Sequence, residues 1–173
     1  MSLLFFSSCL DLRQNTAKMS CAIISARFRE RGSQVKKILV THDGSKASDK
    51  ALKKAVEIGS KFESTIMVLS VVPELYLTEL SDVDRQRILD VMTEETRNAM
   101  EKIRSQLAGK SVDVKMMLRQ GDPAEKILET AKKLKVDLIV TGSHGRHGAK
   151  KFLLGSISSR VVDYATCPVL VVK

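Results

Sequence analysis

Five short apolar runs, separated by four segments with helical periodicity, constrain the fold of this chain more than any other feature. The runs are rich in β-branched residues and span 36–41, 65–72, 112–118, 136–140 and 169–172. Nearly continuous apolar runs of this length are typical of strands whose two faces are both covered. The alternation of strands and helices therefore predicts an α/β fold, with a doubly wound five-stranded parallel sheet and helices on both faces.

Polar residues mark where three of the predicted helices begin. Ser45 precedes a helix expected to end near Phe62, Ser81 and Asp84 open a long second helix, and residues 122–125 open a third. Each start combines a hydroxyl or carboxylate cap with acidic or proline residues in the first turn. The long helix is expected to bury an apolar stripe made of Ile88, Met92, Met100, Ile103 and Leu107.

A glycine-rich segment, 141–156, follows the fourth predicted strand and precedes the last predicted helix. Gly142, Gly145 and Gly148 allow close approach of the backbone to a ligand. Gly155 and Ser156 lie where the helix opens, and its first N–H groups attract anions. The positive residues Arg146, His147, Lys150 and Lys151 add to this attraction. The segment is neither a P-loop nor a G-x-G-x-x-G motif, so we interpret it as a phosphate cradle, with a simple chain turn as the alternative.

The glycine spacing resembles that of a known family. The pattern Gly142-x-x-Gly145, nine residues, then Gly155-Ser156 resembles the nucleotide-binding motif of the universal stress protein family, in its ATP-binding branch. Three other segments are similar to that family: KKILVTHDGS at 36–45, VLSVV at 68–72 and CPVLVVK at 167–173. The resemblance covers residues 35–173 and implies the strand order 3-2-1-4-5. Strand order then reverses between the strands that end near Asp43 and Gly142, which is where such sheets bind ligands.

The resemblance also implies a set of nucleotide-binding residues, with ATP as the ligand. Because a triphosphate carries several negative charges and no acidic cluster would build a metal cage, we expect Mg²⁺ or Mn²⁺ to bind only with the nucleotide. The phosphate and ribose end would be lined by Gly142, His144, Gly145, Gly155, Ser156, Ile157 and Ser158. Asp43 would reach the adenine or ribose end, with Thr41 and Val71 beside it, and His42, Thr141 and Arg146 complete the predicted site. Two simpler alternatives stay open: Ser156 as a plain helix cap, and Asp43 as part of an Asx turn.

The pair Thr41-His42 departs from the family pattern, in which proline followed by a small residue is more usual. The imidazole of His42 has three alternatives: stacking on a base, crowding the pocket, or pointing to solvent. This departure concerns the base end of the site more than the phosphate end.

Catalytic groupings are not evident along the chain. We find no nucleophile–base pair, no run of metal ligands and no paired carboxylates, and Asp43 alone follows the first strand, which argues against a phosphorylation receiver. The sequence therefore favours an ATP-binding stress or signalling module with slow or no hydrolysis. The alternative is an ATP-dependent transferase or hydrolase of the same fold. Net charge is +9, but aromatic content is only 4%, so we do not expect nucleic-acid binding. The apolar runs are too short for us to expect a membrane span.

Residues 1–34 lie outside the resemblance and form a basic N-terminal extension, expected to be poorly ordered, before a nucleotide-binding domain at 35–173. Organelle targeting by this extension is an alternative to the expected cytoplasmic location. The cysteines Cys9, Cys21 and Cys167 have no metal-site spacing and are expected to be reduced. In the implied strand order 169–172 is an apolar edge strand. We therefore expect a homodimer through it, with coverage of the edge by the N-terminal extension as the alternative.

Overall fold

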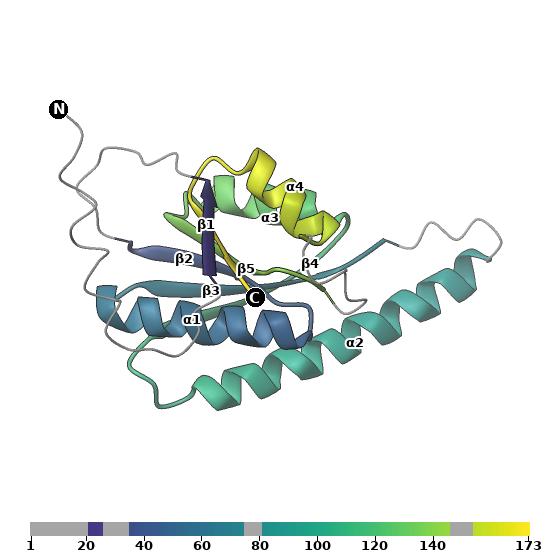
Figure 1. Ribbon diagram of the computed structural model, residues 1–173. Helices are drawn as coiled ribbons and strands as arrows, with labels where there is room; N and C mark the ends of the chain where they lie inside the picture. Colours follow the sequence, from purple (N-terminus) through teal and green to yellow (C-terminus); the bar gives the residue numbers. More distant parts are fainter. Residues whose placement is uncertain (1–20, 26–34, 75–80, 146–153) are drawn as a thin grey trace.

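The chain alternates strands and helices along almost its whole described length (Figure 1). The computed structural model describes residues 21–25, 35–74, 81–145 and 154–173. Its elements are β1 (Cys21–Ser25), β2 (Lys37–Thr41), α1 (Lys46–Phe62), β3 (Thr65–Val72), α2 (Asp82–Leu107), β4 (Asp113–Gln120), α3 (Pro123–Leu134), β5 (Leu138–Gly142), α4 (Ser156–Tyr164) and β6 (Val169–Val172). Strands β4-β3-β2-β5-β6 are neighbours in that order and are parallel, which confirms the predicted order 3-2-1-4-5.

The helices cover both faces of the sheet, as predicted. One core cluster joins the sheet to α1 and α2, through residues such as Ala51, Ala55 and Ile103. The other joins the opposite face to α3 and α4, through residues such as Ile127 and Val161. Figure 1 shows the two helix pairs on opposite sides of the sheet. Strands β2, β3 and β5 are enclosed between the two clusters, which explains why their sequences are apolar without alternation.

Side-chain caps begin three of the helices. Ser45, Ser81 and Asp122 each accept a hydrogen bond from the backbone N–H three residues later, at 3.1, 3.1 and 2.8 Å. These bonds satisfy N–H groups that have no partner within the helix, which is why helix starts can be located from sequence. All three predicted starts are confirmed.

The long helix α2 is buried along its C-terminal half only. Met100, Ile103 and Leu107 lie in the core, whereas Ile88 is 37% exposed. The predicted apolar stripe is therefore wrong for the first half of the helix, which extends past the sheet in Figure 1. No helix in the described part of the chain has both the length and the apolar character needed to cross a membrane.

Strand β1 lies beside β6; it was not predicted as a strand, although coverage of this edge by the N-terminal extension was the alternative that we gave. It pairs antiparallel with β6, with Ala22 opposite Val171 and Ile23 opposite Leu170, and the register shifts between Ile23 and Ser25. The expectation that β6 is the edge strand is therefore wrong, because the sheet has six strands and β1 occupies that edge. Apolar edges invite pairing with another chain, and here a segment of the same chain fills that position.

Candidate functional site

A cleft opens at the carboxyl ends of β2 and β5, where the chain leaves the two strands for opposite faces of the sheet. After Thr41 the chain turns into α1 on one face of the sheet, whereas after Gly142 it leads toward α4 on the other face. The cleft between them has a volume of about 380 Å³. It lies at the carboxyl ends of parallel strands where strand order reverses, which is the usual ligand position in such sheets.

The structure brings the predicted site residues together in this cleft. Its lining includes all of those predicted within the described residues: Thr41, His42, Asp43, Val71, Thr141, Gly142, His144, Gly145, Gly155, Ser156, Ile157 and Ser158. Arg146 lies outside the described residues. The cleft also contains residues that we did not predict, namely Ser48, Leu69, Pro73, Pro123 and Ile127. A role in binding stays a prediction for each of them.

The N-terminus of α4 faces the cleft without a side-chain cap. Its N-cap residue is Gly155, which makes no capping hydrogen bond, and Ser156 is the first helical residue. The interpretation of Ser156 as the helix cap is therefore wrong. Uncapped N–H groups and the positive end of the helix dipole favour an anion at this position.

The carbonyl of Ser143 holds the two ends of the glycine-rich segment together. It accepts hydrogen bonds from the N–H of Gly155 at 2.8 Å and from the hydroxyl of Ser158 at 3.1 Å. The N–H of Ser143 in turn donates to the carbonyl of Val172 at 2.8 Å. Ser158 therefore uses its hydroxyl to support the loop, and its backbone N–H is the group that it can offer to a ligand.

Gly142 and Gly145 lack side chains for different reasons. A Cβ at position 142 would lie 2.9 Å from the carbonyl carbon of Ala47 and 3.0 Å from the nitrogen of Ser48, so Gly142 lets α1 pack against β5. A Cβ at position 145 would lie 2.8 Å from Oδ2 of Asp43, at the cleft. Gly142 thus has a packing role that we did not predict, whereas Gly145 keeps space open beside the Asp43 carboxylate.

We expect Gly142→Ala to lower the free energy of unfolding by about 1–3 kcal/mol, because backbone atoms of α1 cannot yield to the added methyl group. Urea unfolding followed by circular dichroism measures this change. Gly155→Ala is the matched control, since a Cβ there would meet no atom closer than 3.4 Å. Equal stability of the two variants would contradict the packing role of Gly142.

The end of the cleft beside β3 combines apolar side chains with open backbone groups. The N–H of His42 donates to the carbonyl of Leu69 at 2.9 Å, so the backbone polar groups of Leu69 face β2. These groups alternate in direction along a strand, so those of Val71 face the same side. Pairing between β2 and β3 ends at Thr41 opposite Leu69. The N–H and C=O of Val71 therefore face the cleft, between side chains of Pro73, Pro123, Ile127 and Ile157.

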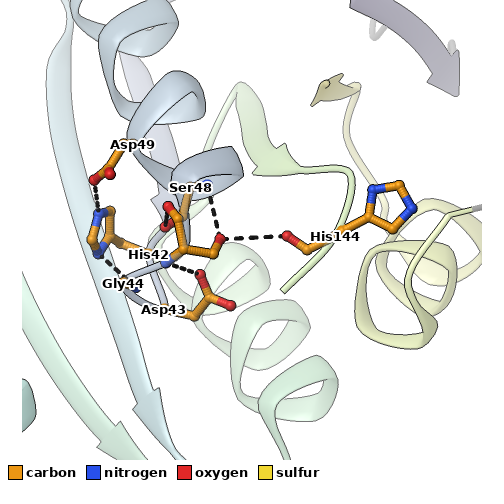
Figure 2. A network of polar contacts seen from close by, with 7 residues as sticks. His42, Asp43, Gly44, Ser48, Asp49 and His144 are labelled. Atoms are coloured by element: carbon orange, nitrogen blue, oxygen red, sulfur yellow. Dashed lines mark hydrogen bonds and ion pairs between the residues drawn. The ribbon is translucent and has the colours of Figure 1, made fainter. Parts of the chain in front are cut away.

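Asp43 is held in a turn at the mouth of the cleft (Figure 2). Its Oδ1 accepts a hydrogen bond from the N–H of Ser45 at 3.0 Å, which is the Asx turn that we gave as an alternative. Partial burial acts to raise the pKa of this carboxyl, but hydrogen bonds from Ser45 and Ser48 outweigh it and lower the pKa below its ordinary value. Asp43 is therefore an ionised hydrogen-bond acceptor at neutral pH, and its turn and its position in the cleft coexist.

His42 does not point to solvent, so that alternative is wrong. Its side chain is 5% exposed, and Nε2 lies 3.0 Å from Oδ1 of Asp49 on α1. The N–H of Gly44 donates to Nδ1 at 3.3 Å. Contacts at both ring nitrogens fix the imidazole between the turn and the helix, as Figure 2 shows.

Three further polar contacts shape the cleft. The hydroxyl of Thr41 donates to Oγ1 of Thr141 at 2.9 Å, which links the ends of β2 and β5. His144 accepts a hydrogen bond at its carbonyl from Ser45 at 3.4 Å, and its Nδ1 lies 2.9 Å from Oγ of Ser143. Its buried Nε2 has no hydrogen-bond partner among the described residues, and Figure 2 shows the ring directed away from Asp43.

Comparisons with known proteins agree on one family. A sequence model of the Universal stress protein family matches residues 34–173. The chain is 34% identical over 152 residues to universal stress protein MJ0531 of Methanocaldococcus jannaschii, across 87% of this chain and 89% of that protein. It is 35% identical over 145 residues to universal stress protein YxiE of Bacillus subtilis, across 79% and 98% of the two chains.

Solved structures show the same fold. Universal stress protein UspA from Lactobacillus plantarum superposes with a TM-score of 0.77 at 30% identity, covering 82% of this chain and all of that one. A more distant family protein from Arabidopsis thaliana, solved with AMP bound, has a TM-score of 0.59 at 21% identity, over 80% and 91% of the chains. The family match spans most of the sequence, and relatives above 30% identity align along most of their own length. The chain therefore belongs to the universal stress protein family.

Proposed function

We propose that this protein binds ATP in the cleft at the carboxyl ends of β2 and β5, and acts as a stress-response or signalling module. One observation carries the proposal: the cleft has an uncapped helix N-terminus at one end and the open backbone of Val71, between apolar side chains, at the other. The first end suits phosphates and the second suits a planar base. A nucleotide has both groups, separated by a ribose.

The backbone of Val71 favours adenine over guanine. Its N–H donates and its C=O accepts, and the edge of adenine offers an acceptor at N1 beside a donor at N6. Guanine presents the reverse pattern there, an N1–H donor beside the O6 acceptor. A pocket built for one pattern leaves polar groups unpaired when it takes the other, which weakens binding.

The ionised carboxylate of Asp43 suits the ribose hydroxyls rather than the phosphates. A carboxylate accepts hydrogen bonds from hydroxyl groups, but it repels the negative charges of a triphosphate. We propose that Asp43 lies beside the ribose and that the N–H groups of 156–158 hold the phosphates. No group of three or more potential metal ligands occurs among the described residues, so Mg²⁺ or Mn²⁺ would be held mainly by phosphate oxygens and water.

We further propose that hydrolysis is slow or absent. His42 has both ring nitrogens engaged within the protein, so it is not placed as a general base. The alternative is an ATP-dependent transferase or hydrolase of this fold, and turnover of ATP with and without acceptor molecules separates the two. We propose a cytoplasmic location, consistent with the expected reduced cysteines.

Calorimetry on the purified protein tests ATP binding, together with mass spectrometry of any nucleotide released on denaturation. We expect ATP to bind, GTP to bind at least about tenfold more weakly, and Mg²⁺ to bind tightly only when ATP is present. Equal affinity for ATP and GTP would contradict the role of Val71. A protein that binds neither nucleotide would refute the proposed function.

A further inference from the structure

We propose that His42 is a positioning residue that presents Asp43 to the bound nucleotide, through its contact with the N–H of Gly44. The inference rests on the proposed function, because it assigns Asp43 to the ligand. It concerns a residue at which this chain departs from the usual family pattern. The starting observation is that His42 is fixed at three points on three different segments.

The three contacts have different directions. The backbone N–H of His42 donates to the carbonyl of Leu69 on β3 at 2.9 Å. Nε2 lies 3.0 Å from the Asp49 carboxylate in the first turn of α1. Nδ1 is 3.3 Å from the N–H of Gly44, which lies two residues further along the same turn. The side chain thus ties the turn to both the sheet and the helix.

These contacts require one form of the imidazole. Gly44 donates its N–H, so Nδ1 must carry a lone pair rather than a proton. The proton of the neutral ring then lies on Nε2, where it donates to the acceptor-only carboxylate of Asp49. Asp49 is therefore the group that orients the ring, and Nδ1 is the group that acts on the turn.

Asp43 lies between the two residues that this contact joins. Gly44 has a φ of +82°; glycine adopts positive and negative φ about equally readily, so the hydrogen bond to Nδ1 favours this one conformation of the turn. The Asp43 carboxylate has its own hydrogen bond from Ser45, and its Oδ2 lies in the space next to Gly145. The hydrogen bond from Gly44 to His42 thus restricts the backbone that follows Asp43. It therefore also restricts the direction of the Asp43 carboxylate. Such preorganisation lowers the entropy cost of ordering the turn when a ligand binds.

Two conservative variants separate the contacts. In His42→Asn the side-chain carbonyl oxygen takes the place of Nδ1 and accepts from Gly44, but nothing reaches Asp49. In His42→Gln the amide nitrogen takes the place of Nε2 and donates to Asp49, but nothing accepts from Gly44. We expect His42→Asn to bind ATP within about threefold of the wild type, and His42→Gln to bind about tenfold more weakly.

Amide hydrogen exchange without nucleotide supplies an independent readout. The N–H of Gly44 should be protected in the wild type and in His42→Asn, and should exchange freely in His42→Gln. Thermal unfolding of both His42 variants identifies any loss of ATP affinity that is due to misfolding. Asp49→Asn should also weaken ATP binding and speed exchange of the Gly44 N–H, but less than His42→Gln does, if Asp49 orients the ring. A Gln variant that binds and exchanges like the wild type would overturn the proposal, as would an Asn variant as weak as Gln. If the wild type binds no nucleotide, the proposed function fails. Separately, a Gly44 N–H that exchanges at the same rate in His42→Gln as in the wild type would show that the His42 contact is absent.

Discussion

Gly145→Val should weaken ATP binding at least about tenfold, on the order of 1.4 kcal/mol, in a protein that still folds. A Cβ at this position would lie 2.8 Å from Oδ2 of Asp43, and the carboxylate cannot move away without giving up its hydrogen bond from Ser45. The two methyl groups of valine would add bulk to the space where the structure brings the loop and Asp43 together. Gly145 is exposed and has an ordinary φ, so the cost falls on the cleft rather than on the core. Calorimetry measures the change in affinity.

Two controls complete this experiment. Gly145→Ala adds the Cβ alone and should have an intermediate affinity, which relates the effect to side-chain size. Gly109→Ala introduces a strained residue at a φ of +80° far along the chain from the cleft, and should lower stability without changing affinity. ATP affinity that is unchanged in a folded Gly145→Val protein would contradict the placement of the nucleotide beside Gly145.

Removing the β1 pairing should change the protein from a monomer to a dimer. In the full chain β1 occupies the edge beside β6, so the proposed homodimer through β6 can form only after β1 leaves. Substituting both Ala22 and Ile23 with proline removes two consecutive N–H groups, at least one of which belongs to the ladder, because neighbouring residues direct these groups to opposite sides. The edge of β6, a run of four buried apolar residues, would then be open to a second copy.

Sedimentation velocity at several micromolar concentrations tests this expectation. We expect the wild type to sediment as a monomer and the double proline variant to show a concentration-dependent dimer. Deletion of residues 1–34 should reproduce the result. A wild type that dimerises as strongly as the variant would show that β1 does not control this edge. Val171→Lys is not a usable control, because Val171 is 1% exposed in the core and a lysine there would disrupt the fold.

The parallel part of the sheet could be predicted from the sequence because the apolar runs of the strands and the polar residues that begin the helices indicated the same order of elements. Each strand was an apolar run of the expected length, and Ser45, Ser81 and Asp122 marked helix starts by chemistry that acts within four residues. The strand β1 was missed because its partner β6 lies at the other end of the sequence. Pairing of that kind depends on tertiary structure, and the short apolar run in Cys21–Ser25 was not enough to identify a strand within a basic segment.

Most residues that line the cleft could be predicted from the sequence, but the contact that each of them makes could not. Glycine spacing identified Gly142 without indicating that α1 packs against it, since the contact with Ala47 joins segments far apart in sequence. Ile157, which the resemblance assigned to the site, is 41% exposed because the first turn of α4 lies at the mouth of the cleft. For His42 the sequence left three orientations open, and the fold selected a contact with Asp49, seven residues along the chain in the first turn of α1.

The antiparallel pair β1–β6 joins residues near 21–25 to residues 169–172, which is among the longest sequence separations in the fold. Contacts of this kind raise contact order and impose a large loop-closure entropy, so they form late during folding. Among the elements, β1 packs mainly on β6, with fewer contacts to α4. It can therefore detach as a separate unit through a sub-global opening reaction, while the two core clusters stay intact. Slow exchange in β5 and faster exchange in β1 would show that access to the β6 edge is governed by this local equilibrium and not by the global stability of the domain.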